Sequence, residues 1–320
     1  MILEDVFRMY YAPIIIPTLC RYEHFKKCIE SLDSNPWAKH TDVYVGLDYP
    51  SKDSYKEGYA KICEYLDTAD LSFANVHVIK REENYGAVRN VEDLFDIVSR
   101  EYDRYILTED DNIFSVNFLE YMDTMLEYIK DKKEYFGVCG YSYPVYWVTD
   151  ALHTNIELQT AFPAWGYATF FSNRNRMIEE YTHDFLVKSI RCEDKVKKIR
   201  SLGNIPFNWY INRVWDTEVL HHDIDMQIYQ VITDKASILP CKSLVRNMGW
   251  DGTGLNCQTT AFDFSTQNID NEPISFDIMP PSDTNEKNTW EFICSLNSIS
   301  YVTVLKTWIK FVLLRLGLKR

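Results

Sequence analysis

The sequence predicts an α/β fold in which a mostly parallel, mixed sheet is flanked by helices. Two observations predict it: short apolar runs rich in β-branched residues alternate with stretches whose apolar residues recur at helical spacing, and the links between them are short. The chain of 320 residues is long enough for one large domain of this kind with a tail. We expect that domain to cover residues 1–275, followed by a linker and a basic amphipathic C-terminal helix over residues 276–320.

The expected elements are regular in the first half of the chain. Its strands are expected at residues 12–17, 42–47, 76–79, 105–108 and 136–139, and its helices at 22–32, 55–66, 88–98 and 118–129. The second half is less regular. We expect an aromatic, loop-like stretch over 141–165, one or two charged helices over 175–202, a helix over 223–233, a short strand around Ile238 and an irregular acidic linker over 262–281.

Side chains suited to ligand binding follow several of the expected strands. They are Thr18, Asp48, Asn84 and an acidic triplet made of Glu109, Asp110 and Asp111. In a parallel sheet covered by helices, ligands bind beyond the carboxyl ends of the strands. We therefore expect these side chains to converge on one edge of the sheet.

The acidic triplet is the strongest chemical signal in the sequence. Three consecutive acids at a strand end are electrostatically costly unless a cation binds them. Sites for Mg²⁺ use carboxylate oxygens, commonly one or two carboxylates together with substrate phosphates. The triplet therefore predicts a site for Mn²⁺ or Mg²⁺ and a nucleotide diphosphate. The alternative is a turn in which Asp111 or Asn112 caps the following helix.

The strand and triplet, followed by the segment FSVNFLEYM at 114–122, resemble the GT-A fold glycosyltransferases. The resemblance covers about residues 12–254 and is closest to bacterial polysaccharide-synthesis transferases and the N-acetylglucosaminyltransferase I group, where EDD replaces the commoner D-x-D. It implies a Rossmann-like sheet and a metal-dependent hexosyl- or N-acetylhexosaminyltransferase. The expected donor is a nucleotide sugar, UDP-linked in the first place, with GDP and dTDP left open. The expected acceptor is a glycan or a lipid-linked sugar in surface polysaccharide synthesis.

The same resemblance implies roles for individual residues near the triplet. Asp111 is expected as the metal ligand, with Glu109 beside it. Gly86 allows close backbone approach, and a helix starting near Ala87 offers free N–H groups to an anion. The donor-binding residues implied by the resemblance are Pro17, Thr18, Arg21, Asp48, Asn84, Gly86, Asp110 and Arg246.

Later motifs supply the rest of the expected site. The same resemblance implies that Trp165 and Gly166 line the sugar pocket. It also implies that Trp250 and Asp251 belong to a glycine-rich loop over 249–254 that orders over the donor. An inverting transferase also needs a carboxylate that accepts the proton of the acceptor hydroxyl. Two acids at the start of the helix over 223–233 match this role, Asp223 first and Asp225 second; the alternative is that both only stabilise the helix N-terminus.

Net charge and cysteine content limit which partners and which cellular compartment we expect for this chain. A net charge of −13 disfavours nucleic acid as a ligand. The 8 cysteines form no C-x-x-C pair, and the first residues lack the basic and apolar regions of a secretory signal, so we expect reduced thiols and a cytoplasmic location.

The last segment of the chain has the opposite charge. No acidic residue follows Glu291, and residues 300–320 carry five cations among Trp, Phe and aliphatic side chains. This pattern is typical of a basic helix that lies on an anionic membrane surface, here the inner face. The alternative is a helix docked on the protein or on a second subunit of an oligomer.

Two other functions share parts of this pattern. A sugar-1-phosphate nucleotidyltransferase has a glycine-rich basic loop after the first strand, whereas this chain has Pro-Thr-Leu-Cys-Arg at 17–21. A catalytically silent relative that binds a glycan or a nucleotide would not need the triplet and an acid at position 223. A P-loop NTPase is excluded because no G-x-x-x-x-G-K-[ST] motif occurs.

Overall fold

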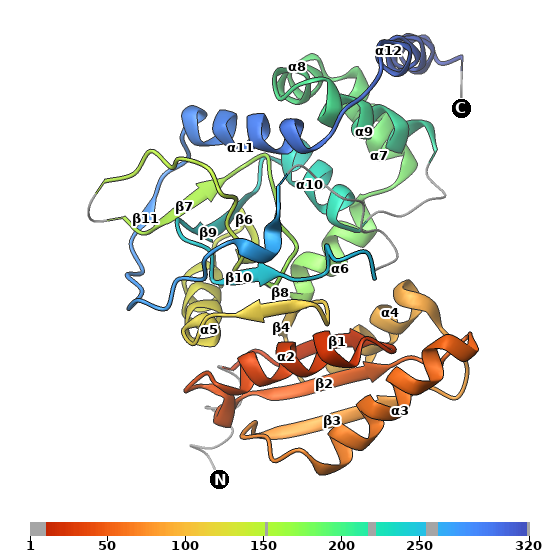
Figure 1. Ribbon diagram of the computed structural model, residues 1–320. Coiled ribbons are helices and arrows are strands. Elements are labelled where there is room, and N and C mark those ends of the chain that lie inside the picture. Colours follow the sequence, from red (N-terminus) through yellow and green to blue (C-terminus); the bar gives the residue numbers. More distant parts are fainter. Residues whose placement is uncertain (1–10, 151–152, 217–221, 254–261, 319–320) are drawn as a thin grey trace.

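The computed structural model describes residues 11–150, 153–216, 222–253 and 262–318. Within these ranges, the chain forms a nine-stranded sheet covered by helices and a separate two-stranded ribbon (Figure 1). The sheet order is β11-β7-β9-β6-β8-β4-β1-β2-β3, and the ribbon pairs β10 with β5. The predicted α/β class with a mostly parallel, mixed sheet flanked by helices is confirmed.

The elements of the first half lie close to their predicted positions. The strands are β1 (Ile14–Thr18), β2 (Asp42–Leu47), β3 (Asn75–Lys80), β4 (Arg104–Leu107), β5 (Asn112–Phe114) and β6 (Tyr135–Cys139). The α-helices are α2 (Tyr22–Asp33), α3 (Asp53–Thr68), α4 (Gly86–Val98) and α5 (Phe118–Ile129), with a short 3₁₀ turn η1 (Ala38–His40).

The second half contains more elements than predicted. The strands are β7 (Asn155–Leu158), β8 (Tyr167–Phe170), β9 (Ala236–Pro240), β10 (Val245–Asn247) and β11 (Ile278–Met279). The helices are α6 (Phe171–Glu180), α7 (His183–Arg191), α8 (Glu193–Ser201), α9 (Asn204–Trp215), α10 (His222–Thr233), η2 (Phe264–Thr266), α11 (Asp283–Leu296) and α12 (Tyr301–Arg315).

The sheet aligns the carboxyl ends of its first strands at one edge. Strand β1 is parallel to β2 and β4, and β2 is parallel to β3, so Thr18 pairs with Leu47 and Leu47 with Lys80. Strand β8 runs antiparallel between β4 and β6, and β7 runs antiparallel beside β9. The loops after β1, β2, β3 and β4 therefore meet at one edge, as the sequence predicts.

Helices cover both faces of this sheet, which explains its continuous apolar runs. On one face, Ile14 and Ile16 of β1 pack in a core that includes residues of α2 and α5. On the other face, Ile15 packs in a second core with residues of α4 and α10. Alternate residues of β1 thus point into different cores, as expected for a strand buried on both sides.

A third core lies among helices of the second half. It joins α7, α8 and α9 with one face of α10 and with Phe311 and Leu314 of α12. Figure 1 shows α7, α8, α9 and α12 at one end of the molecule, and β1, β2 and β3 with α3 and α4 at the other. Helix α10 contributes Tyr229 to the sheet core and Val231 to this helical core, so it connects the two layers.

Residues 276–296 pack against the main sheet, whereas the sequence predicts that they belong to a linker. Strand β11 adds to the main sheet beside β7. Trp290 of α11 is 3% exposed and its indole N–H donates to Thr160 Oγ1 at 2.8 Å. Glu286 accepts hydrogen bonds from the Gln159 amide and the Thr160 hydroxyl. The sheet therefore uses chain from both sides of the expected boundary at residue 275.

Candidate active site

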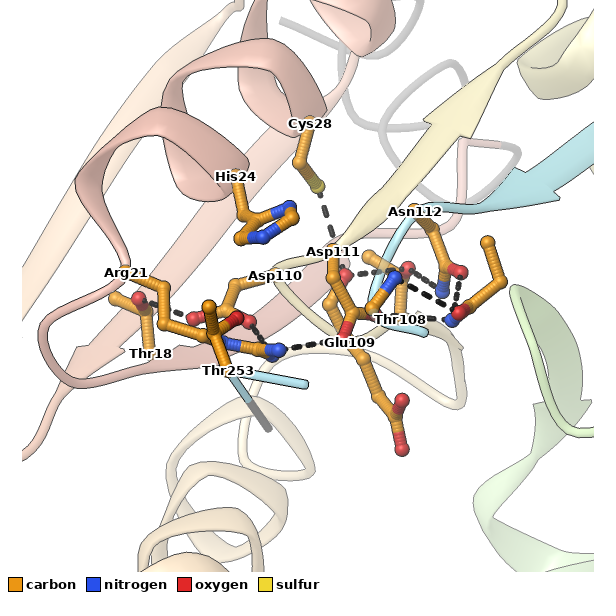
Figure 2. A network of polar contacts seen from close by, with 12 residues as sticks. Thr18, Arg21, His24, Cys28, Thr108, Glu109, Asp110, Asp111, Asn112 and Thr253 are labelled. Atoms are coloured by element: carbon orange, nitrogen blue, oxygen red, sulfur yellow. Dashed lines mark hydrogen bonds and ion pairs between the residues drawn. The ribbon is translucent and has the colours of Figure 1, made fainter. Parts of the chain in front are cut away.

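The carboxyl edge of β1 and β4 holds a buried network centred on the acidic triplet (Figure 2). Thr18, the last residue of β1, donates its hydroxyl to Asp110 at 2.8 Å. Arg21 lies just before α2 and forms ion pairs with both Asp110 and Asp111, the second at 2.8 Å. Pro17 lies within β1 opposite Gly46 of β2. The structure therefore brings Thr18, Arg21, Asp110 and Asp111 together.

The electrostatics of this network depend on burial. Desolvation raises the pKa of Asp110, Arg21 opposes that rise, and the neighbouring charge of Asp111 adds to it. Burial also disfavours the charged form of Arg21, yet the two carboxylates outweigh it and raise the pKa of Arg21 above its ordinary value. The guanidinium is thus a permanent cation at the place where the sequence predicts a divalent one.

A ribbon from the second half of the chain closes on Asp111. Asn247 at the end of β10 pairs with Asn112 of β5, and its side-chain amide donates to Asp111 Oδ1 at 3.0 Å. The Met248 amide donates to the Asp111 carbonyl at 2.8 Å. A Cβ added at Gly249 would lie 2.1 Å from Asp111 Oδ2, so a larger residue would displace the Asp111 carboxylate from this position. The predicted glycine-rich loop therefore begins against the triplet.

The same loop is tied to helix α2 by a second polar contact. His24 of α2 lies 2.9 Å from Asp251 Oδ2, and Thr253 donates to Asp251 Oδ1 through its backbone and its hydroxyl. Partial burial would raise the pKa of Asp251, but the hydrogen bonds from Thr253 and His24 prevail and lower it to about 2. Asp251 is therefore ionised across the physiological range. Gly254, the last residue of the predicted loop, lies outside the described residues.

Glu109 differs from the other two acids of the triplet. Figure 2 shows its side chain extending away from the Arg21 ion pairs. Glu109 is exposed to solvent, yet partial desolvation by the surrounding chain, followed by the charges of Asp111 and Asp110, raises its pKa. Asp223 also contributes to this rise, so the N-terminus of α10 lies close enough to act on the triplet. Within the described residues, Asp110 and Asp111 are thus paired with Arg21, whereas the Glu109 side chain extends away from that pair.

These residues fit only one kind of metal site. Within the described ranges, no three His, Cys, Asp or Glu side chains gather around a common point. The predicted pair of Asp111 and Glu109 is therefore not preformed as a protein-only site. Asp111 and Asp110 do fit a cation held by one or two carboxylates and completed by substrate phosphates. Arg21 would have to release Asp111 for that cation to bind.

Asp48 accepts hydrogen bonds on both of its oxygens from within the protein. Its Oδ1 accepts from the amides of Tyr49 at 2.9 Å and Tyr85 at 2.7 Å. Its Oδ2 accepts from the Asn84 side chain at 3.1 Å and the Gly86 amide at 2.8 Å. The anion at the start of α4 is therefore Asp48 itself, not a free position for a phosphate. Gly86, with φ of 74°, begins this helix in a conformation that suits glycine.

The predicted sugar-binding residues lie in an aromatic cluster. The ring of Trp165 lies 4.6 Å from Tyr141, 5.0 Å from Phe264 and 6.4 Å from Trp250. Gly166 has φ of 66° and a Cβ there would meet Phe114 at 3.0 Å. The structure thus brings Trp165 and Trp250 together, each partly exposed.

The two candidate bases on α10 have different surroundings. Asp223 is exposed at the start of the helix and contributes to the pKa shifts of Glu109 and of the partly buried Tyr143. Asp225 is 3% exposed, forms an ion pair with Arg213 at 2.5 Å and accepts from the Tyr181 hydroxyl at 2.9 Å. Asp223 therefore lies within electrostatic range of Glu109, whereas Asp225 ties α10 to α9 and to the residue that follows α6.

Arg246 lies on the other face of the ribbon from Asn247. Alternate residues of a strand point to opposite sides, and Asn247 points to Asp111. Arg246 Nε is buried and has no hydrogen-bond partner within the described part of the chain. The predicted role of Arg246 in donor binding therefore stays a prediction.

Sequence reasoning assigned no role to three residues that shape this edge. Asn247 donates to Asp111 and lies two residues before the predicted glycine-rich loop, so its position beside that loop was the available signal. His24 has no such signal, because its partner Asp251 is 227 positions away. Arg81 follows β3 and is buried, with Nε donating to Asn90 at 2.9 Å and its guanidinium over the Tyr85 ring.

A cavity of about 690 Å³ lies elsewhere, between α8 and α11. Gln159 and Thr160, which line it, follow β7, an antiparallel strand whose end reaches the amino edge of the parallel strands. The cavity is therefore at the opposite edge of the sheet from the triplet.

No protein-family model matches the sequence, and no curated protein matches it by sequence. Among solved structures, the chain is similar to S. aureus TarS with a TM-score of 0.32 at 11% identity over 45% of this chain and 24% of that one. A structure of TarS 1-349 gives a TM-score of 0.39 at 11% identity over 73% and 59%. The mannosyltransferase PcManGT from Pyrobaculum calidifontis, in complex with GDP-Man and Mn²⁺, gives 0.37 at 12% identity over 52% and 46%.

These similarities concern the arrangement of secondary structure alone. The chain spans less than two thirds of the length of each of these proteins: 24%, 46% and 59%.

The two acids of α10, Asp225 and Asp223, are expected to differ in how much each contributes to the stability of the fold. Asp225→Asn should lower the free energy of unfolding by about 3–5 kcal/mol, because it leaves the buried Arg213 guanidinium uncompensated. Asp223→Asn should change it by less than about 0.5 kcal/mol, since the side chain is exposed. Chemical denaturation of both variants measures the difference. Equal stability of the two variants would contradict the assignment of Asp225 to the structural ion pair.

Proposed function

We propose that this chain is a metal-assisted glycosyltransferase that uses a nucleoside-diphosphate sugar. The donor is proposed to be UDP-linked, and the acceptor a glycan or a lipid-linked sugar. The observation that carries the proposal is the placement of Arg21 on Asp110 and Asp111 at the carboxyl edge of β1 and β4. Asp110 and Asp111 form a buried acidic pair that is already neutralised by one cation, the Arg21 guanidinium. Such a pair is suited to bind a divalent cation together with the two phosphates of a nucleotide sugar.

The proposed donor site uses both the carboxylates of Asp110 and Asp111 and the guanidinium of Arg21. Asp111, with Asp110 behind it, would hold Mn²⁺ or Mg²⁺, whose chemistry is to neutralise the diphosphate as it leaves with negative charge. Arg21, once displaced from Asp111, is proposed to bind the diphosphate oxygens, for which a guanidinium fork is suited. Thr18 keeps Asp110 oriented through its hydroxyl. Arg21 thus replaces one anionic partner with another and stays paired throughout.

The proposed nucleotide position lies beside the Asp48 network. Because Asp48 is already bound to the loop after β3, we assign it the role of shaping this surface instead of contacting the base. Tyr49 follows Asp48 and is 44% exposed, so its ring is available to a flat base or ribose at this edge. This assignment replaces the donor contact that the family resemblance implies for Asp48.

The proposed reaction inverts the anomeric carbon. The acceptor oxygen forms a bond to that carbon while the bond to the diphosphate oxygen breaks and its electron pair leaves with the nucleotide. Asp223 accepts the proton of the acceptor hydroxyl, a role that needs an exposed carboxylate at the edge of the site. Trp165 and Trp250 present partly exposed rings on which a sugar face would stack.

Asp111→Asn should abolish the metal-dependent part of nucleotide binding. Loss of the carboxylate charge removes the proposed first ligand, so Mn²⁺ should no longer strengthen UDP binding, a change of about tenfold or more. Calorimetric titration with UDP, GDP and dTDP, with and without Mn²⁺, measures this directly. Asp53→Asn is a matched control, because that side chain is 93% exposed on α3. Metal-dependent binding by the Asp111 variant that equals the wild type would remove Asp111 from the site.

Arg21→Gln should shift two affinities in opposite directions. Without nucleotide, Mn²⁺ should bind about tenfold more tightly, because a competing cation that lies 2.8 Å from Asp111 is removed. In the presence of Mn²⁺, UDP should bind more weakly, since a charged hydrogen bond to phosphate is lost. Arg89→Gln serves as the control; that arginine pairs with Glu83 at 2.9 Å and is exposed. Unchanged Mn²⁺ affinity would show that Arg21 does not occupy the cation position.

Asp223→Asn should spare donor binding and reduce transfer by about 10²–10⁴-fold, the usual contribution of a general base. The assay follows nucleoside diphosphate release from nucleotide sugars with Mn²⁺ and a panel of glycan acceptors. Full transfer activity in this variant would exclude Asp223 as the base. If the wild-type protein shows neither turnover with any donor nor a metal-dependent thermal shift with nucleotide, the transferase proposal is wrong.

A further inference from the structure

Helix α12 is apolar on two opposite faces. One face packs on α7 and α9, where Phe311 and Leu314 are buried. Polar contacts reinforce this docking: Asn208 donates to Thr307 Oγ1 at 2.6 Å, and Lys310 donates to Asn212 at 2.7 Å. Because these contacts fix the rotation of the helix about its axis, its other face is presented outward.

Large aliphatic side chains form a row on that outward face. We call them the apolar stripe: Val302, Leu305, Ile309, Val312 and Leu316. Their spacing of three and four residues places them on one side of a helix. Leu305 is 62% exposed, Ile309 51% and Leu316 65%. Single exposed aliphatic residues are ordinary, but a contiguous row of them is typical of a surface that binds another protein or a membrane.

Cations border the apolar stripe on both sides. At 3.6 residues per turn, Lys306 and Lys310 follow one border of the stripe and Arg315 the other. Arg315 pairs with Glu193 of α8 at 2.8 Å, which keeps it at the surface. No acidic residue follows Glu291 in the sequence, although the whole chain has a net charge of −13. This end of the molecule is therefore positive while the remainder carries the negative excess.

We propose that the apolar stripe binds the surface of an anionic lipid bilayer, with α12 lying parallel to it. The helix has 15 residues and is about 22 Å long, which is less than the hydrocarbon thickness of about 30 Å. None of the helices in the described ranges combines the length and apolarity that crossing a bilayer requires. Aliphatic side chains would enter the acyl boundary, and the bordering cations would contact anionic headgroups.

Charge favours this partner over a second copy of the chain. Pairing the stripe with its own copy would bring two basic helices without acidic residues against each other. No acidic residue of α12 would then offset the repulsion between Lys306 and its counterpart in the other copy, whereas an anionic surface supplies negative charge along the whole helix. The inference concerns a face away from the triplet and does not depend on the proposed transferase activity.

Sedimentation of the full chain with lipid vesicles tests the proposal without any sugar donor. Wild-type protein should bind vesicles of phosphatidylcholine and phosphatidylglycerol, bind pure phosphatidylcholine far less, and dissociate as salt is raised. The double variant Leu305→Gln, Ile309→Gln should bind anionic vesicles at least about tenfold more weakly than the wild type, because part of the inserted apolar surface is lost. Ile178→Gln, at a 57% exposed position on α6, is the matched control and should bind like the wild type.

Both glutamine variants change outward-facing side chains, so their unfolding midpoints should match the wild type and separate a binding defect from misfolding. Vesicle binding that survives the double substitution would overturn the proposal, as would a wild-type protein that ignores anionic vesicles. Concentration-dependent dimerisation in sedimentation velocity, lost in the double variant and without vesicle binding, would assign the stripe to a second copy instead.

Discussion

Neutralisation of two adjacent buried carboxylates is the constraint on which this edge of the molecule depends. Asp110 and Asp111 follow a buried strand and are themselves buried, and two adjacent carboxylates in such a place need a cation beside them. Arg21 meets this need from the start of α2, which in turn sets where that helix begins relative to β4. Asn247 satisfies the remaining oxygen of Asp111, so the ribbon of the second half is placed by the same pair of acids.

The first half of the fold could be predicted because each signal is local. The helix expected at 118–129 is α5, and the strand expected at 42–47 is β2, since one apolar period runs through each without interruption. Parallel βα units bring their loops to one edge, which is why the convergence of Thr18 and the triplet followed from the order of elements.

The second half could not be predicted in the same way, since its order comes from distant partners. Strand β8 has only four residues and is buried at each of them, so its sequence carries no alternation from which a strand could be predicted. Trp290 became a core residue through a contact with Thr160, 130 positions earlier. Local pattern likewise could not show that Asp48 accepts hydrogen bonds from residues 84–86, or that Asp225 pairs with Arg213.

Helix α10 lies between two cores, and this position affects how the molecule unfolds under force or on heating. One side of this helix completes the core under the sheet and the other side completes the core around α9 and α12. Neither layer can separate without exposing apolar surface of the other, so we expect one cooperative unit instead of two hinged bodies. The outward face of α12 and the first turn of α10 then move as parts of a single rigid frame.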